Sequence, residues 1–334
     1  MQRLRRALGG PAVRAGLCLL LLTLFVTPNG LARQSEAATT PAASSRTLII
    51  AHRGASAHLP EHTLASYALA YGMGADAIEP DLVMTKDDAL ICAHDLTIQN
   101  TAAMEAKFDL SRRRADGKWY YIDFTLDELR SVKAALGRDA GAASDGGAAA
   151  PSGFSVATLN EMALLIQRLN RTTGRSVAIV PEPKSAKFHN QAGKDIAAAL
   201  VRELATLGYT KRTDACVIQS FELETLRRIR AELKCDLPLV YLFGEPVAPA
   251  VLDDVATFAD GIGPSRKLIE SEPDASGKPG PGSMPDLLTL ARDRRLKVYA
   301  WTLRGDPEAH RRFIEMHRVD GLFTDTPELG QPVR

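Results

Sequence analysis

The chain has 334 residues, of which 45% are hydrophobic, and its 41 Lys and Arg residues balance 40 Asp and Glu residues. This length allows either one large α/β barrel or two smaller domains with full cores. A net charge of +1 offers no global field to hold nucleic acid or an anionic membrane, so neither is expected as a partner and a substrate must be recognised locally.

The N-terminal segment 1–32 predicts a cleaved signal peptide. Several arginines precede the apolar run AGLCLLLLTLFV, which is shorter than the roughly 18 apolar residues of a spanning helix, and small residues lead up to Ala32. An uncleaved membrane anchor is the alternative. Residues 33–46 are small and polar, which predicts a disordered tether. We therefore expect a periplasmic or secreted protein with no stable membrane insertion after cleavage.

Three cysteines follow the signal segment: Cys92, Cys216 and Cys235. At most one intramolecular disulfide can form, so the chain is not a disulfide scaffold. Cys92 and Cys216 lie in apolar, strand-like runs, where a buried small hydrophobic side chain is expected. The sequence has no C-x-x-C pair, so a zinc site of that type has no support.

Short β-rich runs alternate with helix-like segments between residues 47 and 330, which we take as one domain. The runs are TLIIAH, AIEPDLVM, ALICAH, SVAIVPE, CVIQSF, LPLVYLF, ADGIGP, KVYAWT and GLFTD. This alternation predicts a parallel sheet closed into a (β/α)8 TIM barrel. There are nine candidate strands for eight places, and the turn KDDA joins two of them without a helix. The barrel is therefore irregular there, or one candidate is not a barrel strand.

An insertion is predicted after the third of these runs. Residues 96–153 are too many for a simple connection, so they indicate an excursion from the barrel. Within them, 137–153 (GRDAGAASDGGAAAPSG) has the low complexity of a mobile surface loop.

Two carboxylates occur two positions apart in the run AIEPDLVM. Glu79 and Asp81 project from the same face of a strand, among apolar neighbours that make uncompensated charges costly. Taken alone, this spacing favours a solvated surface pair, since isolated charges are usually exposed. Glu182 and Lys184 repeat the spacing at the end of another apolar run. Three hard oxygen ligands without cysteine suit one divalent cation, Ca²⁺ or Mg²⁺, and Lys184 would face the same cavity.

Two histidines end predicted strands, His52 in LIIAH and His94 in LICAH. Barrel active sites lie at the carboxyl ends of strands, so these residues are candidates for acid and base. A structural role is the alternative for either one alone. A solvated or capping role is expected for the other five histidines: His58, His62, His189, His310 and His317.

Several motifs resemble the glycerophosphodiester phosphodiesterase family, particularly its bacterial periplasmic type. They are AHRGAS, LPEHTLASYALAYGMGADAIEPDLVMTKDDALICAHD, DGKWYYIDFTLDEL, VPEPKSAKFHNQAGKDIA, VIQSFELETLRRI, DGIGP, AWTLR and DGLFTDTPE, in the family's order from residue 48 to 328. H-R-G alone is a weak signal, but H-R-G, E-x-D, H-D and E-x-K in this order are specific. Pro80 and Pro183, inside the E-x-D and E-x-K motifs, depart from the pattern; each removes a backbone donor from its strand.

The resemblance implies the roles of the residues named above. It places His52 and His94 as acid and base, Arg53 on the phosphate, and Glu79, Asp81 and Glu182 on the cation. The products would be an alcohol and sn-glycerol 3-phosphate, and the nucleophile either water or the glycerol 2-hydroxyl. The insertion after His94 would help to cover the site and to fit the glycerol end of the substrate.

Other residues at predicted strand ends are candidates for lining the pocket: Gln219, Phe221 and Trp301, with core packing the alternative for the two aromatic rings. Glu61 either orients His52 or caps the following helix, and Asp325 is a candidate for a structural role. Two other functions fit the same barrel: a catalytically silent binding module, and a phospholipase of the C or D type. The sequence does not indicate an oligomeric state.

Overall fold

The computed structural model describes residues 46–132, 153–270, 284 and 286–331. The predicted signal peptide, nearly all of the tether and nearly all of the low-complexity loop lie outside these residues and stay predictions. In the described part of the chain, no helix has both the length and the apolar character needed to cross a bilayer.

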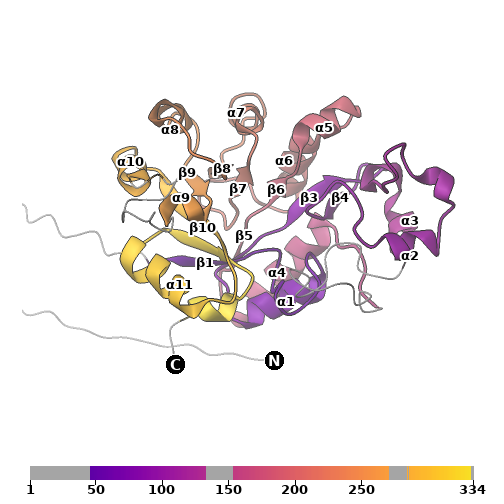
Figure 1. Cartoon of the computed structure of the whole chain (residues 1–334), viewed down its shortest axis with the longest axis horizontal. Coiled ribbons are helices and arrows are strands. Elements are labelled where there is room, and N and C mark those ends of the chain that lie inside the picture. The colour runs from indigo at the N-terminus through magenta and orange to yellow at the C-terminus, as the bar shows by residue number, and fades with distance from the viewer. Residues whose placement is uncertain (1–45, 133–152, 271–283, 285, 332–334) are drawn as a thin grey trace, which may run out of the picture. The chain divides into compact units, whose positions relative to one another are not determined.

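Eight parallel strands form the ring of a (β/α)8 barrel, as the alternation of runs predicted (Figure 1). Seven neighbouring pairs follow the order β5-β2-β1-β11-β10-β9-β8-β7. The ring closes between its end strands, because Ile179 in β5 bridges Cys216 just before β7. The strands are β1 (Leu48–Ala51), β2 (Ala77–Ile78), β5 (Ala178–Ile179), β7 (Ile218–Ser220), β8 (Leu239–Phe243), β9 (Gly261–Pro264), β10 (Lys297–Leu303) and β11 (Gly321–Thr324).

Helices surround this ring (Figure 1). Their apolar side chains pack in the same core clusters as those of the strands. In α6, for example, Ile196, Leu200 and Leu204 are spaced four residues apart and are fully buried. The helices are α1 (Leu64–Gly72), α4 (Leu159–Thr173), α5 (Ala186–Gln191), α6 (Ile196–Thr206), α7 (Leu223–Ala231), α8 (Pro249–Val255), α9 (Arg266–Ile269), α10 (Leu287–Asp293) and α11 (Pro307–Arg311), with a π-helical turn at Arg312–His317 and a 3₁₀ turn at Pro327–Gly330.

Two of the barrel strands are interrupted at their carboxyl ends. The chain after β2 resumes as β3 (Asp81–Met84), and the chain after β5 resumes as β6 (Glu182–Pro183). Pro80 and Pro181 lie in these gaps, and proline has no N–H to donate to a ladder. β3 and β6 pair in parallel, with Asp81 opposite Glu182.

The ninth strand candidate is not part of the ring. ALICAH forms β4 (Leu90–Cys92), which pairs with β3 in the antiparallel direction. The turn between β3 and β4 is too short for a crossover helix, so only a hairpin can form there. This resolves the irregularity that the KDDA turn indicated, in favour of one candidate lying outside the barrel.

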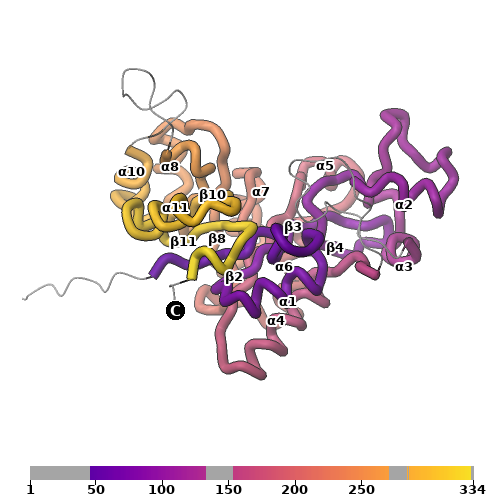
Figure 2. The backbone as a smooth tube through the Cα atoms, turned by 60° about the horizontal axis from the view of Figure 1, so that its bottom comes forward, coloured from indigo at the N-terminus to yellow at the C-terminus, as the bar shows by residue number. Residues whose placement is uncertain are grey.

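The described part of the insertion, residues 96–132, has a small hydrophobic core of its own. Trp119, Phe124 and Met104 are fully buried and pack against Val83 and Ile91 of the β3–β4 hairpin. Figure 2 shows this segment extending from the hairpin beside the barrel. Its elements are α2 (Thr101–Glu105), two 3₁₀ turns (Leu110–Arg112 and Tyr121–Asp123) and α3 (Leu126–Arg130).

The inside of the ring is filled rather than open. Ile50, Val180, Val240, Tyr299 and Phe323 form one buried cluster drawn from strands around the barrel. The three cysteines Cys92, Cys216 and Cys235 are buried free thiols, which confirms the expected burial of Cys92 and Cys216. A packed barrel leaves the carboxyl ends of the strands as the place where polar side chains can meet a substrate.

Candidate active site

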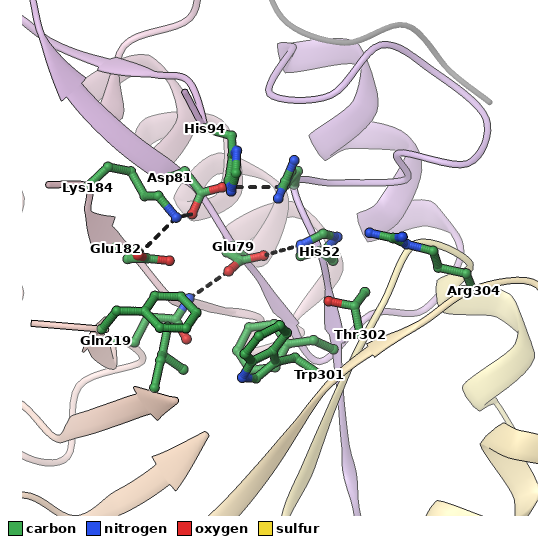
Figure 3. A pocket seen from close by; sticks show the side chains of 14 residues that line it. His52, Glu79, Asp81, His94, Glu182, Lys184, Gln219, Trp301, Thr302 and Arg304 are labelled. Carbon is green, nitrogen blue, oxygen red and sulfur yellow. Dashed lines mark hydrogen bonds and ion pairs between the residues drawn. The ribbon is translucent and has the colours of Figure 1, made fainter. Parts of the chain in front are cut away.

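A cavity of about 110 Å³ opens at the carboxyl ends of the barrel strands (Figure 3). Almost every residue that the sequence singled out contributes to it; Glu61 is the exception. Its wall consists of His52, Arg53, Glu79, Asp81, His94, Glu182, Lys184, Gln219, Phe221, Leu242, Trp301, Thr302, Arg304 and Phe323.

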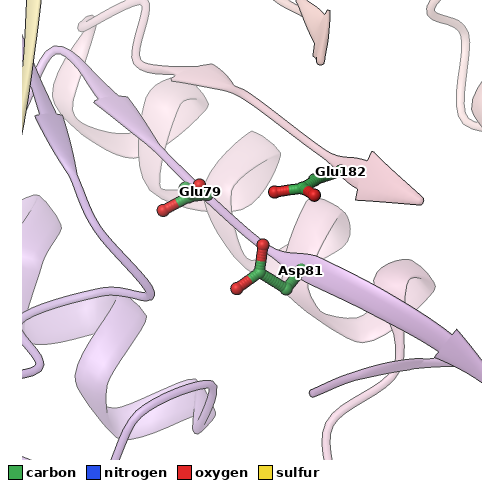
Figure 4. Close-up of side chains that lie close together, drawn as sticks. All are labelled: Glu79, Asp81 and Glu182. Carbon is green, nitrogen blue, oxygen red and sulfur yellow. The ribbon is translucent and has the colours of Figure 1, made fainter. Parts of the chain in front are cut away.

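The three predicted carboxylates lie together in this cavity (Figure 4). Glu79, Asp81 and Glu182 are buried, and one oxygen atom from each lies within 4.8 Å of the others. Asp81 and Glu182 face each other across the β3–β6 pair, whereas Glu79 lies in the gap between β2 and β3. The interruption of the strand thus places Glu79 as a third carboxylate beside the pair of Asp81 and Glu182.

The acidic cluster fits a divalent cation. Among the described residues, none donates a hydrogen bond to Glu79 Oε2 or Asp81 Oδ1, although both atoms are buried. Buried, unpartnered carboxylate oxygens are costly, and hard oxygen donors are the ligands that Mg²⁺ and Ca²⁺ prefer. Glu79, Asp81 and Glu182 are therefore the residues that would hold the cation.

The charges in the cluster shift each other's ionisation. Burial, followed by the charges of Asp81 and Glu182, raises the pKa of Glu79 well above its usual value. Burial also raises the pKa of Glu182, to about 8. Burial alone would raise the pKa of Asp81 too, but Lys184, His62 and Arg53 outweigh it and hold that pKa well below its usual value. Burial and like charge thus oppose ionisation of Glu79 and Glu182, whereas neighbouring cations favour the charged form of Asp81.

Two cations border the carboxylates. The Lys184 ammonium lies 3.0 Å from Glu182 Oε1 and 3.9 Å from Asp81 Oδ1. Arg53 Nε lies 3.3 Å from Asp81 Oδ2, and Arg53 Nη1 donates to Glu61 Oε2 at 2.7 Å. Both cations line the cavity, so a phosphate bound there would meet positive charge from two sides.

The prediction for Glu61 was wrong. Its carboxylate holds Arg53 rather than His52, and the cap of α1 is the hydroxyl of Thr63, which accepts from Ser66 N. Glu61 is buried and does not line the cavity. The PEHT motif therefore acts on the site through Arg53, which the local sequence spacing could not show.

His52 is supported from behind by Asp325, which follows β11. His52 Nδ1 lies 2.5 Å from Asp325 Oδ1, and because a carboxylate only accepts, Nδ1 carries the proton. Nε2 is then the free nitrogen, and it lies 3.9 Å from Glu79 Oε2. Burial lowers the pKa of His52, against the opposing effect of Asp325, so the ring is neutral near pH 7.

His94 reaches the same cavity by a different route. It follows β4, so the expectation that it ends a barrel strand was wrong, although the hairpin brings it to the barrel's carboxyl end. His94 Nδ1 bonds Asp95 Oδ1 at 2.8 Å, and burial lowers the pKa of the ring. The two histidines thus share one arrangement: Nδ1 on a carboxylate and Nε2 available.

Three of the histidines expected to be solvated or capping are buried: His62, His189 and His310. His62 belongs to the site, since its Nε2 lies 3.1 Å from Asp81 Oδ2. His189 accepts from Met84 N and His310 bonds Thr324, so both support strands. The remaining two, His58 and His317, form hydrogen bonds with Glu328 and Glu270 at partly exposed positions.

The opposite wall of the cavity is aromatic. Phe221 and Trp301 meet edge to face with ring centroids 5.4 Å apart, and Trp301 Nε1 donates to Gly263 O at 2.7 Å. Phe221 is 42% exposed, which places it at the mouth of the cavity rather than in the core. The structure thus decides against core packing for Phe221.

Four residues near the reacting groups were not predicted as site residues. They are His62, Asp325, Thr302 and Arg304, whose Nε lies 2.9 Å from Asp325 Oδ2. The Thr-Asp pair at the end of the run GLFTD could have indicated Asp325 from the sequence, whereas no motif indicates Arg304. No described residue of 96–132 lines the cavity.

Comparison with known proteins agrees with this geometry. Residues 52–329 match the glycerophosphoryl diester phosphodiesterase family. A glycerophosphodiester phosphodiesterase of Haemophilus influenzae is 33% identical, with 94% of this chain and 96% of that protein covered. One from Treponema pallidum is 32% identical, with 86% and 91% covered.

The fold comparison points the same way. The crystal structure of a candidate glycerophosphoryl diester phosphodiesterase from Silicibacter pomeroyi superimposes with a TM-score of 0.65 and 25% identity, covering 86% of this chain and 92% of that one. The chain belongs to the glycerophosphoryl diester phosphodiesterase family and is a hydrolase of glycerophosphodiesters.

Proposed function

We propose that the protein hydrolyses glycerophosphodiesters to an alcohol and sn-glycerol 3-phosphate, using one divalent cation, with His52 and His94 as acid and base. The observation that carries this proposal is the single cavity that holds both histidines, three clustered carboxylates and two cations.

The phosphate is held by opposite charges. A cation on Glu79, Asp81 and Glu182 supplies charge neutralisation of the phosphoryl oxygens when bound. Arg53 is held in place by Glu61 and faces the cavity, so it can donate to a non-bridging oxygen. Lys184 adds a second positive charge, offsetting negative charge that builds up as phosphorus becomes five-coordinate.

The histidines move the protons. Asp325 and Asp95 occupy the Nδ1 positions of His52 and His94, so Nε2 of each ring is the atom that exchanges a proton. One ring removes a proton from the nucleophile, which is water or the glycerol 2-hydroxyl, and the other protonates the leaving alkoxide. Lowered pKa values keep a neutral ring available as the base near pH 7.

The function is tested with purified protein and a panel of substrates. Glycerophosphocholine should release choline and sn-glycerol 3-phosphate, whereas lysophospholipid and phosphatidylinositol should react far more slowly. Faster hydrolysis of either lipid would favour a phospholipase, and no hydrolysis of any substrate would favour a silent binding barrel. Asp254→Asn, which removes a carboxylate distant from the cavity, is the matched control for site variants.

We also propose that the enzyme is exported and acts in the periplasm or outside the cell. The support is the sequence of residues 1–32, whose short apolar run and small residues before Arg33 suit cleavage. Mass spectrometry of protein recovered outside the cytoplasm should find an N-terminus near Arg33. An intact Met1 in that fraction, or a purely cytoplasmic pool, would contradict the proposal.

A further inference from the structure

Each carboxylate of the acidic cluster has one oxygen held by a donor from the protein. Gln219 Nε2 donates to Glu79 Oε1 at 2.6 Å, and His62 Nε2 lies 3.1 Å from Asp81 Oδ2, which also has Arg53 Nε at 3.3 Å. Lys184 lies 3.0 Å from Glu182 Oε1. For Glu79 and Asp81 the second oxygen, Oε2 and Oδ1 respectively, accepts no hydrogen bond from the described chain.

Gln219 and His62 are themselves held in place by the surrounding structure. Gln219 belongs to β7 and is fully buried, and its amide must present the NH₂ group because the carboxylate only accepts (Figure 3). His62 is also buried, and its Nδ1 lies 2.9 Å from the hydroxyl of buried Tyr67. Nε2 of His62 donates to Asp81, and the hydrogen bond between Nδ1 and the Tyr67 hydroxyl fixes the orientation of the ring.

We propose that Gln219 and His62 are positioning residues that restrict Glu79 and Asp81 to one metal-binding oxygen each. This inference rests on the proposed metal site. An oxygen that accepts a hydrogen bond from a fixed donor has one lone pair fewer and a set direction, which disfavours binding a cation through both oxygens of that carboxylate. Ca²⁺ accepts six to eight oxygens and readily takes bidentate carboxylates, whereas Mg²⁺ demands a compact octahedron of single oxygens. The two donors therefore bias the cluster against the binding mode that favours Ca²⁺.

The prediction concerns the ratio of the affinities for Mg²⁺ and Ca²⁺, because loss of a purely structural residue would weaken the binding of both cations together. Gln219→Leu removes the donor to Glu79, and His62→Asn shortens the donor to Asp81. Asn suits position 62 because the backbone there is left-handed, with φ 59°. In either variant the Mg²⁺ dissociation constant should rise by about 10- to 100-fold, the usual effect of losing an outer partner of a ligand. The Ca²⁺ dissociation constant should change by less than about threefold, since an oxygen that loses its hydrogen-bond donor becomes more accessible to Ca²⁺.

Isothermal titration calorimetry of the metal-free protein with MgCl₂ and CaCl₂ measures both constants without relying on turnover. His62→Gln restores an N–H at nearly the reach of the imidazole and should recover most of the wild-type ratio. Gln167→Leu and His310→Leu are matched controls, because each removes a hydrogen-bonded side chain of the same type away from the cluster. Circular dichroism checks folding, and Gln219→Asn replaces Gln219→Leu if the latter does not fold.

The outcomes separate this inference from the proposed function. The inference is overturned if the ratio of the Mg²⁺ and Ca²⁺ dissociation constants stays within about twofold of the wild-type ratio in both variants. An equal loss of affinity for both cations is one way in which the ratio would stay unchanged. If the wild type binds neither cation, the metal site of the proposed function fails instead. A wild type that binds and hydrolyses normally, with variants that shift the ratio as stated, supports both.

Discussion

The two halves of the barrel contribute different chemistry to one cavity. The half from β1 to β6 supplies the charged groups: His52, Arg53, Glu79, Asp81, His94, Glu182 and Lys184. The half from β7 to β11 supplies a mainly apolar wall: Phe221, Leu242, Trp301 and Phe323, with Gln219, Thr302 and Arg304. A substrate with a charged phosphate and less polar ends can be oriented by this division.

The strands of the two halves differ in the same way. In the first half, β2 and β5 stop after two residues, and Glu79 and Val180 lie in the gaps that Pro80 and Pro181 enforce. In the second half, β8, β9 and β10 pair without such a gap, and β10 runs for seven residues. The β10–β11 pair is the exception in this half, because its register shifts between Ala300 and Leu303, where Trp301 and Thr302 line the cavity.

The largest expected effect is loss of the acidic cluster. Asp81→Ala, or removal of divalent metal with a chelator, should abolish hydrolysis, because the cluster then lacks a cation to compensate its buried charge. Turnover of glycerophosphocholine, with metal content measured by elemental analysis, checks this. Undiminished turnover in protein shown to be metal-free would mean that the acidic cluster of the charged half is not needed for hydrolysis.

Loss of either histidine comes next. His52→Ala and His94→Ala should each lower kcat by about 10² to 10⁴, the usual contribution of a general acid or base. KM and metal affinity should change little. The double variant should lose less than the product of the single losses, because paired groups act in one transition state. Wild-type rates in both single variants would show that the charged half does not carry the proton transfer.

A p-nitrophenyl ester of glycerol phosphate refines the histidine result. Its leaving group needs no proton, so this substrate should rescue the variant that lacks the general acid and leave the other impaired. The identity of the rescued variant assigns the two roles.

Asp325 tests whether the second half also contributes to the chemistry. Asp325→Asn removes the carboxylate behind His52 Nδ1 and should lower kcat by about 10- to 100-fold, less than loss of the ring itself. KM should stay near the wild-type value. Steady-state kinetics beside Asp254→Asn as control measure the difference, and an unchanged kcat would make Asp325 merely structural.

The aromatic wall should affect binding more than rate. Phe221→Leu removes the edge-to-face contact with Trp301 and should raise KM by about two- to tenfold, with kcat nearly unchanged. Phe258→Leu, at a distant and partly buried position, is the matched control. A drop in kcat as large as that of a histidine variant would mean that the division between a reactive and a binding half is wrong.

The smallest expected effect is on stability and comes from His310 in the second half. Burial lowers the pKa of His310, so the folded state holds the ring neutral while the unfolded chain protonates it below about pH 6.5. This contribution to stability is present above the unfolded pKa and is lost as the pH falls towards the folded value. His310→Gln should therefore flatten the decline in unfolding free energy between about pH 7.5 and pH 5, measured by urea denaturation. An equally steep decline in the variant would assign it to other groups.

Much of the architecture followed from local patterns. The alternation of apolar runs with amphipathic segments predicted the barrel, and the spacing of Glu79 and Asp81 predicted a shared face. The hairpin of β3 and β4 was less certain, because a two-sided apolar run such as ALICAH suits a barrel strand and a hairpin strand equally. The choice was made by the turn before it, which leaves no room for a helix.

The sequence alone determined the fold class, the carboxylate cluster and the two histidines, because strand periodicity and strand ends are local properties that place side chains on a known face and edge. Only the tertiary structure decided which groups support them. His62 comes from the segment before α1, Gln219 from β7 and Asp325 from beyond β11, and each meets a partner distant in the chain. Such contacts depend on how the ring closes, and no spacing within a single segment carries that information.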